Sequence, residues 1–348
     1  MNRRYFFKNT GLASVAAGFS LPLKMAETVF SEKQKLLKPA RLRAGATVAL
    51  IAPAGPFTEE KLANARRNFE TFGLKVKEGK NLFARNGYLA GTDEQRLADL
   101  HGAFSDPAVE AVWCIRGGYG CTRLLPKIDF DLIRKNPKPF IGYSDVTALH
   151  LAIQRESGLV TFHGPVAASD FPENTLQHFR AALMEPVFPY AINIPGEQEI
   201  LPGPEFRPFV ISPGTARGKL IGGNLSLLAA MVGTPFFPSF KNKIVFIEDV
   251  GEQPYRLDRM LTQLLQATDL QKAAGIALGV FFDCQPKPDS PSLTLEEMLR
   301  DRLSGLGIPV IYGLPFGHVP HQATFPYGIE AELNVEKGAL SLLESGVI

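Results

Sequence analysis

Short apolar runs alternate with helix-like segments through the first half of this chain, and that alternation restricts its possible folds more than any other feature. Runs with the length and composition of strands lie at 47–52, 74–77, 109–115 and 139–142. Apolar residues at helical spacing occupy 58–73, 94–104 and 145–154. Strands that alternate with helices form a parallel sheet with helices on both faces. We therefore predict an α/β domain with a parallel sheet over residues 40–170.

The second half of the chain predicts another domain that contains both strands and helices, over residues 215–345. Before it, prolines recur between 171 and 214 and periodicity fades, so we expect a linker there with one short helix near 175–184. Beyond it, we expect strands at 243–247, 276–282, 309–312 and 329–335, and helices at 255–266 and 293–303. Two domains suit a chain of 348 residues.

The charge balance and the cysteines exclude several classes of protein. The chain has 37 Lys and Arg against 35 Asp and Glu, and no basic stripe, so we expect no nucleic-acid partner. The three cysteines are an odd number without a CxxC pair, so we expect neither a disulfide framework nor a zinc site. Cys114 lies in an apolar run, which is typical of a buried and unreactive thiol. We expect no metal and no cofactor.

The N-terminal residues 1–26 resemble a twin-arginine export signal rather than part of the fold. Arg3 and Arg4 precede large apolar residues and then a weakly apolar stretch at 11–23, which is too short to span a bilayer comfortably. An amphipathic N-terminal helix packed on the domain is the alternative. The signal predicts an exported, periplasmic protein, and without it the protein would be cytoplasmic.

A serine lies at the predicted corner between the strand at 139–142 and the helix at 145–154. Ser144 follows the strand through Gly142, and a hydroxyl at such a corner projects at the carboxyl edge of the sheet, where α/β sites gather. The pattern resembles a nucleophile elbow, although Val146 stands where G-x-S-x-G has its second glycine. Capping of the following helix by Ser144 is the alternative role.

A glycine-rich loop, RGGYG at residues 116–120, follows the preceding strand. Its glycines permit close backbone approach and leave N–H groups free, as an oxyanion hole requires. The loop lacks the G-x-G-x-x-G spacing and the Lys-Ser/Thr of nucleotide-binding loops. A plain tight turn is the alternative.

His318 is the strongest of six candidate bases, because it follows the strand at 309–312 through a loop at 313–317 whose glycines could aim its ring. Four of the others are weaker candidates: we expect His101 and His178 at the surface, the ring of His150 to point away from Ser144, and His321 to be limited by its neighbour Pro320. His163 lies at a predicted strand end, where we expect it to line the cleft.

Two carboxylates, Glu248 and Asp249, end a strongly apolar strand. A charge there is costly unless it has a partner, and orienting an imidazole is one such partnership. Helix capping or a surface turn is the alternative role for both residues.

Together these segments resemble the LD-carboxypeptidase family of serine peptidases, which includes murein tetrapeptide carboxypeptidases and microcin-immunity hydrolases. The matching stretches are IAPAGP (51–56), RGGYG (116–120), FIGYSDVTALH (140–150), FHGP (162–165), GKLIGGNLSLL (218–228), IVFIEDVGEQPYRLDRMLTQL (244–264) and GLPFGH (313–318). The resemblance implies a flavodoxin-like N-terminal domain, a smaller β-rich α/β C-terminal domain, a site at their interface and a homodimer. The export signal is a departure, since well-known relatives act in the cytoplasm.

Residue by residue, the resemblance implies that Ser144 is the nucleophile, that His318 is its base and that Glu248 orients the base. Backbone N–H groups near Gly118 and Asp145 would form the oxyanion hole. The expected protein is thus a serine carboxypeptidase that releases terminal D-alanine from murein tetrapeptides through an acyl-enzyme.

Such an enzyme must also bind a terminal carboxylate, for which Arg116 or Arg256 is suited. We favour a structural ion pair for Arg256, and regard Gly117 and Tyr119 as further candidates for substrate contact. Three alternatives remain open: a microcin-immunity-like hydrolase of peptidyl-nucleotide amide bonds, a non-catalytic binder of murein peptides, and a flavodoxin-like nucleotide-binding protein.

Overall fold

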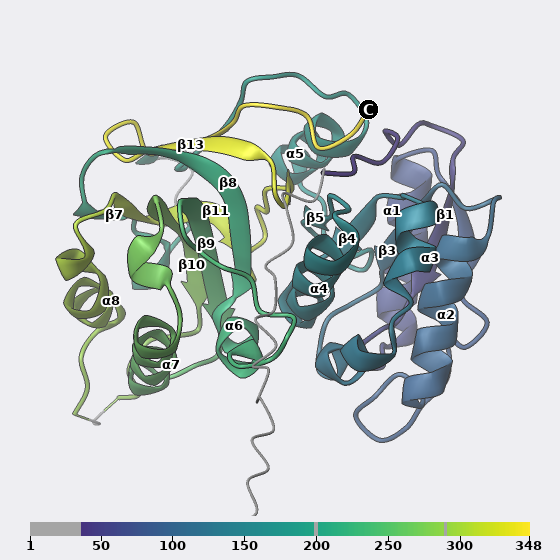
Figure 1. Cartoon of the computed structure of the whole chain (residues 1–348), viewed down its shortest axis with the longest axis horizontal. Helices are drawn as coiled ribbons and strands as arrows, with labels where there is room; N and C mark the ends of the chain where they lie inside the picture. Colours follow the sequence, from purple (N-terminus) through teal and green to yellow (C-terminus); the bar gives the residue numbers. More distant parts are fainter. Residues whose placement is uncertain (1–35, 198–200, 289–290) are drawn as a thin grey trace, which may run out of the picture. The chain divides into compact units, whose positions relative to one another are not determined.

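Two β-sheets organise the part of the chain that the structure, a computed structural model, describes (Figure 1). The described residues are 36–197, 201–288 and 291–348, so the predicted export signal lies outside them. Within these ranges, every helix is too short or too polar to span a membrane.

The first sheet contains the predicted parallel strands in the order β12-β5-β4-β3-β1-β2. Its strands are β1 (Thr47–Ile51), β2 (Lys75–Glu78), β3 (Ala111–Cys114), β4 (Phe140–Gly142), β5 (Phe162–His163) and β12 (Phe325–Pro326). Its helices are α1 (Glu59–Thr71), α2 (Asp93–Ser105), α3 (Phe130–Lys135), α4 (Thr147–Ser157) and α5 (Glu173–Leu183). Strands β1 to β5 pair in parallel and β12 joins β5 antiparallel, which confirms the predicted α/β fold.

Aromatic side chains show that helices cover both faces of this sheet. Trp113 of β3 contacts Phe69 of α1 and Phe179 of α5, with ring centroids 5.4 Å and 4.9 Å away. On the opposite face, Phe140 of β4 stacks on Phe104 of α2 at 6.2 Å. Because successive side chains of a strand alternate between faces, the parallel strands can be buried on both sides.

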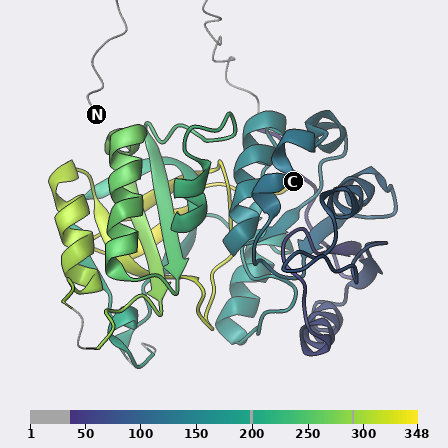
Figure 2. The same ribbon diagram turned by 90° about the horizontal axis from the view of Figure 1, so that it is seen from below.

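The second sheet has the order β6-β14-β13-β8-β9-β10-β11-β7. Its strands are β6 (Tyr190–Asn193), β7 (Phe209–Ser212), β8 (Thr215–Asn224), β9 (Lys243–Val250), β10 (Gly275–Phe282), β11 (Val310–Gly317), β13 (Glu330–Asn334) and β14 (Ala339–Leu342). Its helices are α6 (Leu225–Met231), α7 (Pro254–Ala267) and α8 (Leu295–Leu303). Strands β8 to β11 are parallel and the others antiparallel. Helices α7 and α8 lie side by side on one face (Figure 2).

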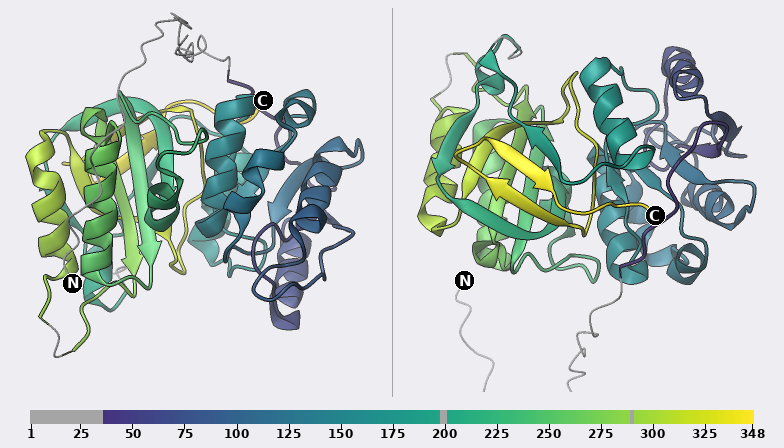
Figure 3. Two further views of the ribbon diagram at one scale, coloured as in Figure 1. Left: turned by 60° about the horizontal axis from the view of Figure 1, so that its bottom comes forward. Right: turned by 90° about the horizontal axis from the view of Figure 1, so that it is seen from above.

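Several elements of the second sheet differ from the prediction. Strands β6 and β7 lie within the segment 171–214, at the two edges of the sheet, where prolines in the flanking chain do not interrupt internal pairing. Strands β8 and β14 and helix α6 were not predicted; β8 lies beside β13, as two further views show (Figure 3). The described part of the second sheet consequently has more strands than the first.

Candidate active site

Ser144 occupies a sharp corner between β4 and the 3₁₀ turn Ser144–Val146 that leads into α4. Its φ is +64°, in the left-handed region that residues other than glycine rarely adopt. Its hydroxyl is hydrogen-bonded to His318 and makes no helix-capping bond. The corner therefore has the geometry of a nucleophile elbow, where a strained residue exposes its side chain at the top of the sheet.

The departure from G-x-S-x-G has a steric explanation. A Cβ atom added at Gly142 would lie 3.0 Å from Cγ1 of Val146, which is closer than ordinary van der Waals contact. The tight corner thus brings the positions two before and two after Ser144 together, and a glycine at one of them relieves the crowding. Here Gly142 supplies the space that allows a valine at the other position.

His318 directly follows β11, which continues to Gly317. The predicted loop at 313–317 is therefore wrong, because these residues are strand. Pairing between β10 and β11 shifts register between Leu278 and Val280, and Gly317 pairs with Val280. A Cβ atom added at the intervening Gly279 would lie 2.4 Å from the carbonyl oxygen of Phe316, so only glycine admits this close approach.

Three side chains from different segments form one hydrogen-bonded chain at this edge. His318 Nδ1 lies 2.8 Å from Oε2 of Glu248, and His318 Nε2 lies 3.1 Å from Oγ of Ser144. Because an ionised carboxylate only accepts hydrogen bonds, Nδ1 carries the proton and donates a hydrogen bond to Glu248. The opposite nitrogen is then free to accept the Ser144 proton, as a general base does.

The surroundings of His318 affect its pKa in opposite directions. Burial disfavours the charged ring, but the negative charge of Glu248 and its hydrogen bond prevail, so the pKa of His318 is raised above 6.5. The Glu248 side chain is completely buried, whereas that of His318 is 19% exposed. The carboxylate is thus shielded from water while the ring remains reachable from outside.

Asp249, the neighbouring carboxylate, has a structural role. It accepts hydrogen bonds from Ser226 N at 2.9 Å and Asn224 Nδ2 at 3.1 Å, at the beginning of α6. Burial and the nearby Glu248 charge raise its pKa to about 6. The capping role that we considered for both carboxylates therefore fits Asp249, whereas Glu248 has the imidazole as its partner.

The glycine loop 116–120 packs against the corner. A Cβ atom added at Gly117 would lie 3.0 Å from Ser144 Oγ and 3.4 Å from the backbone nitrogen of Asp145. Gly118 has a φ of +127° and packs on the loop after β1, where Gly55 N donates to Gly117 O at 3.3 Å. The loop backbone thus lies against both the hydroxyl and the first peptide group of the elbow.

An open cavity of about 470 Å³ adjoins the candidate base. Its lining includes His318, Tyr143, Arg116 and Lys61. Arg116 is held by donating to Pro56 O at 2.6 Å. Lys61 was missed by sequence reasoning; burial and the Arg116 charge lower its pKa. The sequence feature that could have identified Lys61 is its position in the first turn of a helix, where the helix dipole disfavours a positive charge.

The remaining substrate candidates lie apart from this cavity. Tyr119 is half exposed and contacts Tyr88, with ring centroids 5.5 Å apart. Arg256 pairs with Glu252 at 3.5 Å on the exposed side of α7, consistent with a structural role. Neither Tyr119 nor Arg256 lines the cavity beside His318.

Four of the other histidines serve the fold. His163 is fully buried among aromatic rings, so the expectation that it lines the cleft is wrong; burial holds its pKa far below the usual range. His150 is also buried, with Nε2 2.9 Å from Gly142 O. Instead of free surface positions, His101 and His178 are partly buried and hydrogen-bonded to Asp129 N and Tyr190 Oη.

The cysteines are all buried and free, as predicted for Cys114. Burial raises the pKa of the Cys114, Cys121 and Cys284 thiols, so each stays protonated. Among the described residues, no group of three or more His, Cys, Asp or Glu is arranged to hold a metal ion.

Most of the chain is similar to peptidases of one family. The model of the LD-carboxypeptidase N-terminal domain matches residues 48–164, and that of the C-terminal domain matches residues 217–333. The chain is 44% identical over 312 residues to a probable murein peptide carboxypeptidase of Bacillus subtilis, covering 89% of this chain and 95% of that protein. It is 40% identical over 294 residues to the murein tetrapeptide carboxypeptidase of Pseudomonas aeruginosa, covering 82% and 92%.

The fold is also similar to a solved structure of MccF in complex with glutamyl sulfamoyl guanosine. The TM-score is 0.80 at 25% identity, covering 90% of this chain and all of that one. The two domain models together cover the segments that carry Ser144, Glu248 and His318. The chain therefore belongs to the LD-carboxypeptidase family and is a serine-type peptidase.

Proposed function

We propose that this enzyme hydrolyses the L,D-peptide bond that releases terminal D-alanine from murein tetrapeptides, with Ser144, His318 and Glu248 as its catalytic triad. One observation carries the proposal: the hydroxyl, the imidazole and the buried carboxylate form a continuous hydrogen-bonded chain beside an open cavity. The names of the two peptidase relatives support murein peptides as the substrate class.

In this mechanism, His318 Nε2 takes the proton of Ser144 as Oγ attacks the peptide carbonyl. Glu248 stabilises the resulting imidazolium and keeps the proton on Nδ1. The C–N bond then breaks, His318 gives its proton to the amine of the leaving D-alanine, and an ester joins Ser144 to the remaining peptide. Water attacks that ester by the same path in reverse, with His318 again as the base, and frees the shortened peptide.

The negative oxygen that forms during attack needs donors, and the proposal assigns this role to the N–H groups of Gly118 and Asp145. Asp145 N directly follows the nucleophile, as in other nucleophile elbows. The packing of Gly117 against Ser144 and Asp145 keeps the glycine loop near the same point. Removal of a single donor of this kind costs roughly 10²–10³-fold in kcat.

The cavity also has two cations for a terminal carboxylate. Arg116 and Lys61 line it together, and neither has a carboxylate within 4.0 Å in the described structure. The carboxylates of Glu60 and Asp170 also line the cavity, but neither pairs directly with Arg116 or Lys61, so both cations can bind an anion. The proposal therefore places the carboxylate of the leaving D-alanine at Arg116 and Lys61.

A second candidate function is hydrolysis of an amide bond to a nucleotide or an acyl-sulfamate. The observation that favours it is the TM-score of 0.80 with MccF bound to glutamyl sulfamoyl guanosine. The same triad would serve both reactions, but a nucleotide leaving group does not offer a terminal carboxylate. Turnover of the two substrate types side by side separates the candidates.

We extend the proposal to export and assembly. The Arg3-Arg4 pair supports a twin-arginine signal at residues 1–26 and a periplasmic location. Family resemblance supports a homodimer, built of a nucleophile domain at 40–170 and a second domain at 215–345 that carries acid and base. Export is tested with a reporter protein fused to residues 1–26, with and without the substitutions Arg3→Lys and Arg4→Lys. The homodimer is tested by light scattering of the purified protein.

The substrate is tested by incubating purified enzyme with murein tri-, tetra- and pentapeptides and weighing the products. We expect loss of one D-alanine from the tetrapeptide and little change in the tripeptide. Release of D-alanine from the pentapeptide alone would contradict the proposal, because that bond joins two D-residues.

A further inference from the structure

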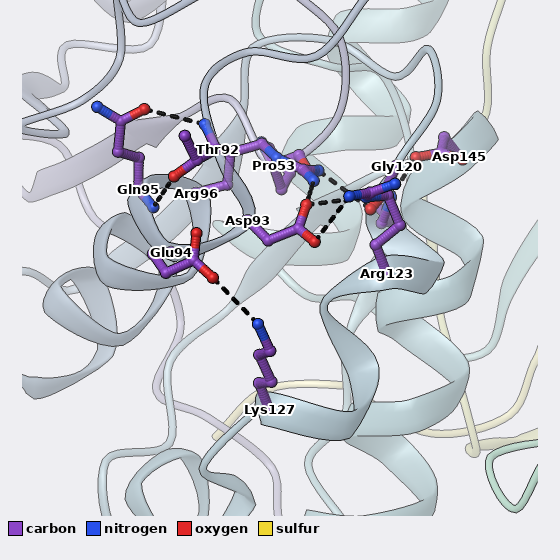
Figure 4. Close-up of polar contacts among 11 residues, drawn as sticks. Pro53, Thr92, Asp93, Glu94, Gln95, Arg96, Gly120, Arg123, Lys127 and Asp145 are labelled. Carbon is purple, nitrogen blue, oxygen red and sulfur yellow. Dashed lines mark hydrogen bonds and ion pairs between the residues drawn. The ribbon is translucent and has the colours of Figure 1, made fainter. Parts of the chain in front are cut away.

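A buried arginine joins the two loops that flank the nucleophile (Figure 4). The side chain of Arg96, on α2, is completely buried. It donates hydrogen bonds to the carbonyl of Pro53, in the loop after β1, and to the carbonyl of Gly120, at 3.0 Å, in the loop after β3. Its counter-ion is Asp93, one turn earlier on the same helix, at 2.6 Å.

The Gly120–Cys121 peptide group is held from both sides. Arg96 binds its carbonyl oxygen, and the carboxylate of Asp145 accepts its N–H at 2.8 Å. Gly120 has a φ of +121°, and a Cβ atom added there would lie 2.8 Å from Nη1 of Arg96, so the guanidinium lies directly on the backbone. A charged donor and a charged acceptor on one peptide plane fix its orientation strongly.

An arginine at this buried position is unfavourable for the free energy of folding. A buried guanidinium carries a large desolvation cost, and apolar residues of similar volume often stabilise such sites better. Nε of Arg96 has no partner among the described residues, so even its hydrogen bonding is incomplete. In return, the guanidinium hydrogen-bonds two carbonyl groups from separate loops. This indicates that the role of Arg96 is to fix the geometry of these loops.

We propose that Arg96 and the Asp145 carboxylate are positioning residues that clamp the Gly120–Cys121 peptide and so fix the oxyanion-binding backbone. The inference rests on the proposed function, in which Gly118 N–H and Asp145 N–H receive the oxyanion. One donor lies two residues before the clamped peptide, and the other belongs to the residue whose side chain forms the clamp. The clamp therefore couples the two donors to one another.

Asp93 anchors this arrangement to the helix. Its carboxylate pairs with Arg96 and also with Arg123, at 2.9 Å and 3.0 Å, in the 3₁₀ turn that follows the loop. Hydrogen bonds from Arg123 and Arg96 hold the pKa of Asp93 below its usual range. Thr92 and Gln95 form a capping box that fixes the helix start on which Asp93 lies.

The test compares Asp93→Asn, Arg96→Lys and Arg96→Met with the matched control Glu94→Gln. Glu94 occupies the next position of α2 and pairs with Lys127 at 3.1 Å, so it links the same segments at the surface without touching the loop. Each variant is measured for kcat and KM on the tetrapeptide, for the rate of Ser144 labelling by a fluorophosphonate, and for its melting temperature. Labelling needs no natural substrate. As Ser144 attacks the fluorophosphonate, negative charge develops on the oxygen of the probe, as it does on the substrate oxygen.

We expect Asp93→Asn and Arg96→Met to lower kcat and the labelling rate by about 10- to 100-fold each, with KM changed by no more than about threefold. Arg96→Lys should recover part of the loss, because the single ammonium nitrogen keeps the charge but cannot replace both Nη1, which binds the two carbonyls, and Nη2, which binds Asp93. Glu94→Gln should resemble the wild type. If Arg96→Met does not fold, Asp93→Asn and Arg96→Lys carry the test.

Folded Asp93→Asn and Arg96→Lys variants with wild-type kcat and wild-type labelling would overturn the clamp, as would a rise in KM with kcat unchanged. Those results would leave the proposed function intact. A wild-type enzyme that is not labelled at Ser144 would instead overturn the proposed function, and the clamp with it.

Discussion

The carboxylate of Glu248 reaches the ring of His318 although a strand lies between the strands that carry them. Glu248 is on β9, His318 follows β11, and β10 separates the two in the sheet, yet Oε2 and Nδ1 are 2.8 Å apart. A Cβ atom added at Gly317 would lie 3.2 Å from Oε2 of Glu248, so the backbone before His318 passes close to the carboxylate. The irregular pairing of β10 at Gly279 makes this approach possible.

Replacement of Gly279 by alanine should disturb this approach. The new Cβ would lie 2.4 Å from the carbonyl oxygen of Phe316, so β11 must shift and move His318. We expect unfolding to become easier by about 1–3 kcal/mol and kcat/KM to fall by roughly 10- to 100-fold. Chemical denaturation and steady-state kinetics measure both effects.

Gly305→Ala is the matched control, because an added Cβ there has nothing within 4 Å. We expect this variant to keep its activity and its stability within about 1 kcal/mol. If both variants lost the same amount of activity and stability, Gly279 would not be specifically required to position His318.

The pH dependence of kcat/KM should report the state of His318. The base works as the neutral imidazole, so activity must fall as the pH drops through its pKa. Burial lowers that pKa, but the charge and hydrogen bond of Glu248 raise it further, to above the ordinary value of 6.5. We expect the midpoint of the acid limb above 6.5; a midpoint clearly below it would show that Glu248 does not control the ring.

Glu248→Gln keeps the shape of the acid but removes its charge. Burial, which lowers the pKa of His318, is then opposed only by the smaller effect of the Asp249 charge, so the acid limb should move to lower pH than in the wild type. The rate should fall by roughly 10³–10⁴-fold, because the amide no longer selects the Nδ1–H tautomer. Glu252→Gln, which removes the carboxylate that pairs with Arg256, should leave the rate and the pH profile unchanged.

Lys61→Met should reveal whether this residue receives the substrate carboxylate. We expect kcat/KM for the tetrapeptide to fall by about 10- to 100-fold, and that for its C-terminal amide to change little, since only the acid contacts the cation. Lys127→Met, which removes a lysine paired with Glu94 at the surface, should affect neither substrate. Equal losses on acid and amide would assign Lys61 a different role.

Much of the N-terminal half could be predicted because its signals are local. Thr58 accepts a hydrogen bond from Lys61 N at 3.3 Å at the start of α1, and Gly158 ends α4 in the left-handed conformation. Strand, cap and glycine patterns of this kind act within a few residues. Ser144 was found for the same reason, since the residues next to it predict its strand-to-helix corner.

The second half was harder because its decisive contacts are distant in the chain. Strand β6 pairs with β14 and β12 joins β5, and such partners cannot be read from periodicity. Residues 313–317 contain two glycines and a proline, which indicate a loop, yet pairing with β10 makes them strand. In the first half, the role of Arg96 was not predicted because the carbonyls that it binds are backbone groups, which are the same in every residue.

The most direct test of the account is the release of D-alanine from an L,D-linked tetrapeptide by the Ser144→Ala enzyme. Without the hydroxyl no acyl-enzyme can form, so release should fall by roughly 10⁴–10⁶-fold. Ser105→Ala, which alters an exposed serine that bonds only Gly102 O, should match the wild type. If Ser144→Ala released D-alanine as fast as the wild type, Ser144 would not be the nucleophile and the proposed triad would be wrong.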